Sequence, residues 1–288
     1  MKRILDGVER LTAMPQTVLE AVRLLQQDSV SAEEIENVLR RDEALSVEVL
    51  RWANSARYGS AGSVLTLRAS VVRLGRAKLL RIVLQHKLGG LFASAGSAYG
   101  LQRGALWRSA LGGAIASEQL AHREGSVPPD QAFLCGLVRD IGKLAFDASL
   151  GANYFEQVRK HCTAKSTFVD AERKCFGFDH AQLGGELAIR WGLPVQVAQA
   201  ITNHHAPPPD APHRRALFDI VHAADVICMW AGLAIGHDGL QYEFDPRVRQ
   251  CLNIDQTGAE GLILDVWCQL REIEELMSVS PSTSTRAS

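Results

Sequence analysis

The chain has 288 residues, of which 47% are hydrophobic and 22% are charged, and its formal net charge at pH 7 is −1. These values are typical of a soluble globular protein with a sizeable core, and the charge of the whole chain gives no sign of a nucleic-acid partner. The six cysteines form no Cys-x-x-Cys pair, no signal peptide is evident and no segment is long and apolar enough to insert into a membrane. We therefore expect a cytoplasmic protein without a disulfide framework.

The first part of the chain predicts short helices. An apolar stripe runs through Thr17–Gln27. Ser31 and Glu34 then have the spacing of a capping box, in which each side chain bonds the backbone N–H of the other residue. Asp42 is positioned to cap the following helix, which ends near Asn54. A longer helical pattern covers Leu67–Leu91, where Gly75 is a candidate break.

The segment between Glu48 and Glu118 contains no acidic residue, although it carries many lysines and arginines. This pattern allows two interpretations, a solvated helix face or a docking surface for an anionic partner. We expect the docking residues, if the second is right, to be Arg68, Arg73, Arg76, Lys78 and Arg81.

The second part of the chain is also helical by its periodicity. We predict helices at Leu101–His122, Asp130–Asp147, Ala152–His161, Thr167–Cys175, His180–Trp191, Pro194–His204, His213–Ala234 and Gly258–Met277. The fold class is therefore all-α. A Gly-, Ala- and Ser-rich stretch at 89–100 divides the chain into an N-terminal helical subdomain (1–95) and a second helical subdomain (96–278), followed by a disordered tail (279–288).

Candidate metal ligands gather in the second subdomain. They are the imidazoles and carboxylates of Asp140, His180, His204, His205, His222 and Asp225. Helical proteins build metal sites from such side chains on several helices. Asp140 lies in the segment FLCGLVRDIGKLAF, which places Arg139 and Asp140 side by side in an otherwise apolar run.

The order of these motifs resembles the HD superfamily of metal-dependent phosphohydrolases and, more closely, the HDOD domains (HD-related output domains) of bacterial signalling proteins. The resemblance covers about Leu11 to His205. It is carried by LTAMPQTVLEAVRLLQQDSVSAEEIENVLRRDEALSVEVLRWANSARYG, LRASVVRLGRAKLLRIVL, FLCGLVRDIGKL and FGFDHAQLGGELAIRWGLP. It implies an HD-like helical bundle preceded by a helical subdomain, and a role as the output of a two-component or second-messenger system.

The chain departs from the HD pattern at two ligand positions. Ser109, in LWRSAL, stands where the first histidine would fall, and Arg139 replaces the histidine of the His-Asp pair. His180, His204 or His205, and Asp225 match later ligand positions. A hydroxyl is a poor ligand, and a guanidinium with a pKa above about 12 is none. Its charge would oppose a cation by roughly 4 kcal/mol at 4 Å and an effective dielectric constant of 20. We therefore expect no catalytic residue, no bound metal and no cofactor.

Two interpretations of Arg139 remain. It supplies the positive charge that a metal would have given, compensating Asp140 and Asp225 in a buried pocket, or it is a solvated arginine opposite the Leu137–Ile141 stripe.

The sequence predicts a non-catalytic signalling module that binds a partner protein such as a kinase, receiver domain or other regulator. Two alternatives are an active phosphohydrolase that uses Asp140, His180, His204, His205 and Asp225, and nucleic-acid or nucleotide binding through the basic 51–87 segment. The second is disfavoured, because no helix-turn-helix or aromatic stacking platform is found.

Overall fold

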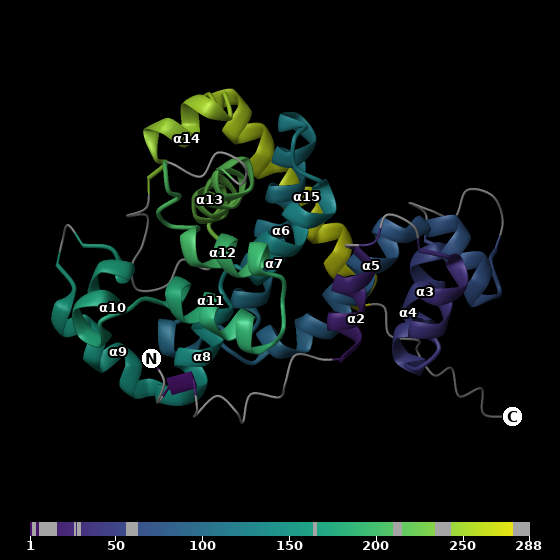
Figure 1. The fold of residues 1–288 in the computed structure, drawn as a ribbon, viewed down its shortest axis with the longest axis horizontal. Helices are drawn as coiled ribbons and strands as arrows, with labels where there is room; N and C mark the ends of the chain where they lie inside the picture. Colours follow the sequence, from purple (N-terminus) through teal and green to yellow (C-terminus); the bar gives the residue numbers. More distant parts are fainter. Residues whose placement is uncertain are drawn as a thin grey trace, which may run out of the picture.

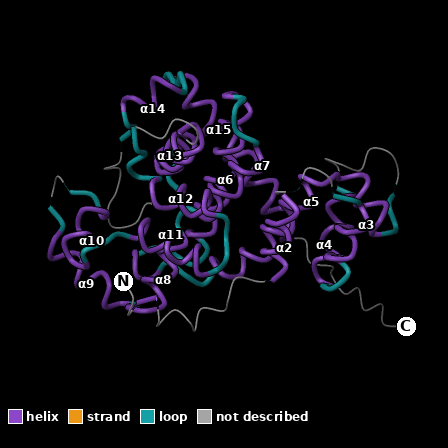
Figure 2. Tube along the Cα trace, in the orientation of Figure 1, coloured by secondary structure: helices purple, strands orange, loops and turns teal. Residues whose placement is uncertain are grey.

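The computed structural model describes residues 1, 4–5, 16–25, 27, 30–55, 63–163, 166–209, 215–233 and 243–278. Over these ranges the regular structure is helical and contains no strand, which confirms the predicted all-α class (Figures 1 and 2). The predicted tail at 279–288 lies outside the described residues.

The N-terminal helices are α2 (Gln16–Leu25), α3 (Ala32–Leu39), α4 (Glu43–Ala53) and α5 (Leu67–Ala93). The capping box of Ser31 and Glu34 is present at the start of α3, and the Asp42 carboxylate accepts a hydrogen bond from the Leu45 backbone N–H at the start of α4. The predicted break in α5 is confirmed at Gly75, whose φ of 74° lies in the left-handed region that favours glycine. In Figure 1 α3, α4 and α5 form a lobe at one end of the molecule.

The remaining helices form a larger body around α6. They are η2 (Ser97–Tyr99), α6 (Ala105–Glu124), α7 (Pro129–Val138), α8 (Ile141–Leu150), α9 (Ala152–Val158), η3 (Arg159–His161), α10 (Phe168–Phe176), α11 (His180–Arg190), α12 (Val195–Asn203), α13 (Arg215–Trp230), α14 (Pro246–Cys251) and α15 (Gln256–Ser278). Helix α6 is buried along most of its length and packs against α5, α7, α13 and α15. It is the axis of this body.

Glycines bring the helices of this body close together. A Cβ on Gly136 of α7 would overlap the Gly113 carbonyl of α6, and a Cβ on Gly142 of α8 would overlap the His180 carbonyl of α11. Gly184 of α11 lies on the other side of the contact with α8, because a Cβ there would lie 3.0 Å from the Gly142 amide nitrogen. The helices of this body therefore pack closely against one another at these glycines.

The structure corrects two of the predicted helices. The single helix predicted over Asp130–Asp147 is wrong, because α7 ends at Val138 and α8 begins at Ile141, which leaves Arg139 and Asp140 in the turn between them. The segment predicted as one helix at Ala152–His161 is α9 followed by the 3-10 turn η3. Helix α14 was not predicted from the sequence.

The predicted subdomain boundary at residues 95 and 96 follows the end of α5 at Ala93. One N-terminal piece nevertheless packs on the larger body, since the Ile4 carbonyl accepts a hydrogen bond from Ser149 Oγ on α8 (3.3 Å). In the part of the chain that is described, none of the helices combines the length and the apolar character needed to span a bilayer.

Candidate functional site

Arg139 lies in the turn between α7 and α8, and its side chain is 1% exposed. Its Nε donates to Asp225 Oδ1 (2.7 Å), and its Nη2 donates to Ser109 Oγ (2.8 Å). Its Nη1 donates to the backbone carbonyls of Ser109 (3.1 Å) and Gly136 (2.9 Å). The alternative of a solvated arginine is therefore wrong. Because Arg139 lies in a turn, its guanidinium points into the protein. In the single continuous helix predicted from the sequence, the same side chain would have pointed to solvent.

Two glycines make room for this guanidinium. A Cβ on Gly113 would overlap Arg139 Nη1 and lie 2.7 Å from Arg139 Cζ. The close approach of α6 and α7 at Gly136 also places that residue's carbonyl within reach of the guanidinium. The absence of side chains at Gly113 and Gly136 therefore leaves space beside α6 for the Arg139 guanidinium.

Asp140 and Asp225 are both buried beside Arg139. Asp140 Oδ2 lies 3.4 Å from Arg139 Nη2, while Asp140 Oδ1 lies 2.9 Å from Lys143 Nζ. Burial disfavours the charged forms, but the two carboxylates outweigh it and raise the pKa of Arg139 above its usual value. Likewise, Lys143 and Arg139 outweigh burial and hold the pKa of Asp140 well below its usual range. Arg139 and Asp140 therefore both remain charged.

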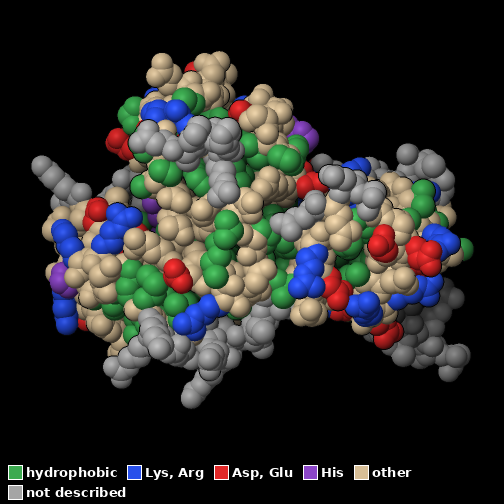
Figure 3. Space-filling model, in the orientation of Figure 1, with side chains coloured by type: hydrophobic (Ala, Val, Ile, Leu, Met, Phe, Trp, Pro, Cys, Tyr) green, Lys and Arg blue, Asp and Glu red, His purple; other side chains and the backbone are tan. Residues whose placement is uncertain are grey.

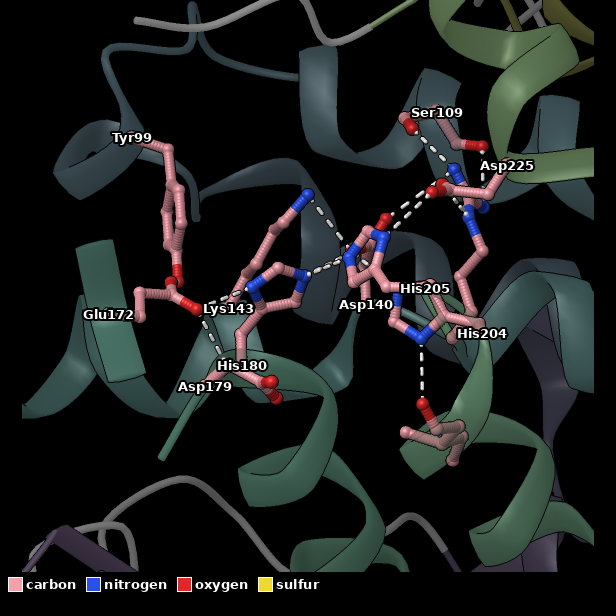
Figure 4. A network of polar contacts seen from close by, with 12 residues as sticks. Tyr99, Ser109, Asp140, Lys143, Glu172, Asp179, His180, His204, His205 and Asp225 are labelled. Carbon is pink, nitrogen blue, oxygen red and sulfur yellow. Dashed lines mark hydrogen bonds and ion pairs between the residues drawn. The ribbon is translucent and has the colours of Figure 1, made fainter. Parts of the chain in front are cut away.

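Three histidines face the other oxygens of the same carboxylates (Figure 4). His180 begins α11, His204 follows the end of α12 and His205 is the next residue. His180 Nε2 lies 3.6 Å and His204 Nε2 lies 4.0 Å from Asp140 Oδ1, and His205 Nδ1 lies 3.5 Å from Asp225 Oδ2. We call these three residues the histidine triad. Each carboxylate thus bridges the triad and the guanidinium.

Hydrogen bonds fix the orientation of two of these rings. His180 Nδ1 bonds Glu172 Oε2 (2.8 Å), and His204 Nδ1 bonds the Ile201 carbonyl (2.6 Å). Because a carbonyl or carboxylate oxygen accepts, the Nδ1 atoms carry the protons and the Nε2 lone pairs point into the cluster. Burial lowers the pKa of His204 and His205, which keeps both rings neutral. Burial also opposes protonation of His180, but Glu172 outweighs it and raises the pKa of that residue.

Glu172 is the centre of a second set of contacts. Its carboxylate accepts hydrogen bonds from the Tyr99 hydroxyl (2.8 Å), from the Tyr154 hydroxyl and from the His180 backbone N–H (2.8 Å). Asp179 caps the same helix start by accepting from the Gln182 N–H. The start of α11, and with it the His180 ring, is therefore held firmly.

The cluster has two chemically different halves. The half at Ser109 and Arg139 does not fit a metal, because the guanidinium already occupies it and offers only donors. In the half at the triad, one ring nitrogen from each of the three histidines lies within 4.8 Å of the other two, a spacing that could hold a metal ion. His222, the sixth candidate ligand, lies outside this group, since its Nδ1 bonds the His204 carbonyl (2.8 Å) and its Nε2 accepts the Asp245 N–H (3.1 Å).

Some of the arginines and lysines of the basic segment pair with acidic side chains from other parts of the chain. Arg68 pairs with Glu36 of α3 (2.9 Å) with its side chain 62% exposed. Arg81 pairs with Glu118 of α6 and stacks over Phe133, so it is largely covered.

Of the other basic residues, Lys87 pairs with Asp42, and Arg76 Nη1 donates to the Gln27 carbonyl (2.7 Å). Arg73 Nη1 donates to the Ala53 carbonyl (3.2 Å), and Lys78 is exposed. In Figure 3 acidic and basic side chains intermingle on this lobe. Acidic residues from both flanks of the segment thus compensate the charges of Arg68, Arg81 and Lys87.

The sequence reasoning missed Lys143, Glu172, Gly113 and Gly136 as parts of the cluster. Lys143 follows Asp140 by three residues and could have been found from that helical spacing. The others reach the cluster only through contacts between helices distant in sequence, which no local pattern indicates.

Comparisons with known proteins identify the family and the fold. The family model described as HDOD domain matches residues 11–207. A solved HDOD domain protein with unknown function from Geobacter sulfurreducens is 25% identical, with a TM-score of 0.70 and 96% of each chain covered. A provisionally named phosphohydrolase from Shewanella amazonensis SB2B is 23% identical, with a TM-score of 0.67 over 96% of this chain and 98% of that one.

Two further proteins are similar over less of their own length. A provisionally named signal transduction protein from Marinobacter aquaeolei VT8 is 21% identical, with a TM-score of 0.70 over 93% of this chain and 60% of that one. An uncharacterized protein from Treponema pallidum (strain Nichols) is 27% identical over 216 residues, which are 70% of this chain and 39% of that protein. The chain therefore spans about two fifths of the length of this curated relative.

Proposed function

The chain belongs to the HDOD domain family, and on that premise we propose that it is a non-catalytic regulatory module of bacterial signalling that acts by binding a partner protein. One observation carries this proposal: the buried guanidinium of Arg139 fills the space between Ser109 and the two carboxylates. The name of the Marinobacter neighbour supports a signalling role.

The argument against hydrolysis is electrostatic. Metal-assisted hydrolysis needs a cation that activates water and polarises the scissile phosphate. In this chain the Arg139 guanidinium forms ion pairs with Asp225 and with one oxygen of Asp140. A guanidinium offers no coordination position to water or substrate, and it is a fixed part of the protein. A cluster of this kind holds its helices in place and keeps a charge balance without turning over a substrate.

Nucleic-acid binding receives little support. It would need several uncompensated cations on one face, yet Arg68, Arg81 and Lys87 each pair with an acidic side chain of a neighbouring helix. A protein partner that makes mixed polar and charged contacts suits this surface better. We place the module in the cytoplasm, in keeping with its six free cysteines, of which Cys135 and Cys228 are buried.

The test is affinity capture from the native cell with quantified protein recovery. Arg68→Gln with Lys78→Gln removes two exposed charges of α5, and the matched control, Arg159→Gln with Lys160→Gln, removes two exposed charges of η3 at the other end of the molecule. We expect a partner that the wild type and the control recover and that the α5 variant loses. If all three proteins recover the same partner, the exposed charges of Arg68 and Lys78 on α5 do not bind it. Phosphodiesterase turnover by the protein would contradict the non-catalytic role.

A further inference from the structure

A cleft of about 410 Å³ lies where the N-terminal helices meet the larger body. It is lined by Val22 of α2 and Arg76 of α5 together with residues of α7 and α12. In Figure 1 α2 lies between the lobe and the larger body. Pockets that bind small molecules usually measure about 300–1,000 Å³. The cleft therefore has room for a small ligand, which would touch both parts of the chain.

The lining of the cleft is more apolar than polar. Its apolar side chains are Val22, Pro128, Leu134, Pro194 and Val197. Val22, Leu134 and Val197 belong to the buried core, so close packing on their other sides holds them in place. Apolar surface of this kind is covered favourably by an apolar group and poorly by a strongly hydrated one. We therefore expect a ligand that has an apolar part.

Two half-buried side chains of opposite charge, Arg76 and Asp130, also line the cleft. The Arg76 guanidinium donates from Nη1 to the Gln27 carbonyl (2.7 Å), and it pairs with no carboxylate among the described residues. Asp130, in the first turn of α7, has no ion-pair partner in the described part of the chain either. By contrast, Arg68 and Arg81 on the same helix as Arg76 each pair with a glutamate. A partly desolvated charge is stabilised by an opposite charge, so the cleft favours a ligand with both a negative and a positive group.

We propose that the cleft binds a small zwitterion with an apolar side chain, namely a free amino acid or a short peptide. The planar fork of a guanidinium matches a carboxylate, so Arg76 binds that end of the ligand. Asp130 accepts hydrogen bonds from the ammonium group. The apolar side chain lies on Val22, Leu134 and Val197. The proposal goes beyond the regulatory function above, because it assigns the module a small-molecule ligand.

Other classes of ligand satisfy the cleft less well. A phosphate or another anion without an ammonium group pairs with Arg76 but leaves Asp130 uncompensated in the same cleft. An amine without a carboxylate has the converse defect, and an uncharged apolar molecule leaves both charges without a partner. Gln131 and Gln196 carry neutral amides on the same lining, and these suit the peptide group of a dipeptide.

The experiment is a calorimetric titration of the full chain with L-leucine, L-phenylalanine and L-leucyl-L-leucine. We expect at least one of them to bind saturably with one equivalent, and tighter binding of the dipeptide than of leucine identifies a short peptide as the source. The tightest ligand is then titrated as its N-acetyl derivative, which lacks the ammonium group, and as its amide, which lacks the carboxylate. Each derivative should bind about tenfold or more weakly, because one charged hydrogen-bonding partner is lost.

Two variants connect these derivatives to the residues of the cleft. Arg76→Gln should weaken binding of the tightest ligand to a similar extent but leave binding of its amide unchanged. Asp130→Asn should do the same with respect to the N-acetyl derivative. In each case the substitution removes a partner that the derivative no longer uses.

Arg103→Gln is the matched control, since it removes an exposed arginine that does not line the cleft and should leave the affinity unchanged. The absence of saturable binding for all three ligands overturns the proposal, as does a derivative that binds as tightly as its parent. Circular dichroism reports whether each variant is folded. If Arg76→Gln or Asp130→Asn is unfolded, the derivatives still decide with the wild-type protein alone. Partner capture is measured separately, so failure here leaves the proposed regulatory function standing.

Discussion

Replacing Arg139 with methionine should destabilise the protein strongly, because it leaves two buried carboxylates without their main counter-charge. The guanidinium makes four hydrogen bonds, to Asp225, to Gly136 and twice to Ser109, and an ion pair with Asp140. Methionine fills a similar volume but satisfies none of these acceptors.

Removing one partner of a buried ion pair costs about 3–5 kcal/mol, since the remaining charge stays desolvated. Lys143 still faces Asp140 in the variant, whereas Asp225 loses its strongest partner, so we expect a value near the middle of that range. Domains typically unfold with a free energy of about 5–15 kcal/mol. The loss is therefore a large fraction of the total and should be visible as a clear shift of the denaturation midpoint.

The assay is urea denaturation at pH 7 with a chelator present, followed by circular dichroism. Arg159→Met is the control, because the side chain of Arg159 is 55% exposed in its pair with Glu156 and should contribute within about 0.5 kcal/mol. Adding Asp225→Asn to Arg139→Met should recover part of the loss, since it removes a charge left uncompensated. A stability within about 1 kcal/mol of the wild type for Arg139→Met would refute the reasoning, because that is the cost of an ordinary substitution.

Three further outcomes follow from the contacts. Gly113→Ala should cost about 1–3 kcal/mol in thermal or urea unfolding, because its methyl group would overlap Arg139 Nη1, and the cost should shrink when Arg139 is shortened to alanine. Ser109→His with Arg139→His should raise Mn²⁺ affinity in a competition assay, since it replaces a hydroxyl and a fixed cation with two imidazoles; no gain would show that these positions cannot face a metal. Asp42→Ala should cost about 1 kcal/mol, because Asp42 caps α4 and pairs with Lys87. Since that pair lowers the pKa of Asp42, its contribution is present above the unfolded pKa of about 3.9 and is lost as the pH falls further, so the difference from wild type should vanish in acid denaturation curves and a constant difference would contradict this.

The fold was predictable to the extent that local pattern determines it. The capping residues Ser31 and Asp42 and the break at Gly75 act through their own backbone neighbours, and each is found where its residue type indicates. The turn at Arg139 and Asp140 was not predictable in this way, because the apolar periodicity continues from α7 into α8 without a break. In the folded chain this turn lets Arg139 reach Ser109 of α6 and Asp225 of α13, and those contacts join distant parts of the sequence.

The residues of the candidate site were likewise predictable only in part. Its imidazoles and carboxylates were identified from their residue types, and Ser109 and Arg139 were identified through the family resemblance. The structure brings Ser109, Arg139 and Asp225 into direct contact. Glu172 could not be found, since nothing in its local sequence shows that its carboxylate collects two tyrosine hydroxyls and a histidine. The separation of the cluster into a guanidinium half and a histidine half likewise exists only in three dimensions.

The most direct measurement of the central claim is phosphodiester hydrolysis by the purified full chain. The substrate is bis-p-nitrophenyl phosphate, and the protein is supplied in turn with Mn²⁺, Fe²⁺ and Zn²⁺ beside a His204→Gln variant. With Arg139 fixed between the carboxylates, we predict no turnover above the metal-only blank for either protein. Turnover by the wild type that His204→Gln abolishes would contradict the account.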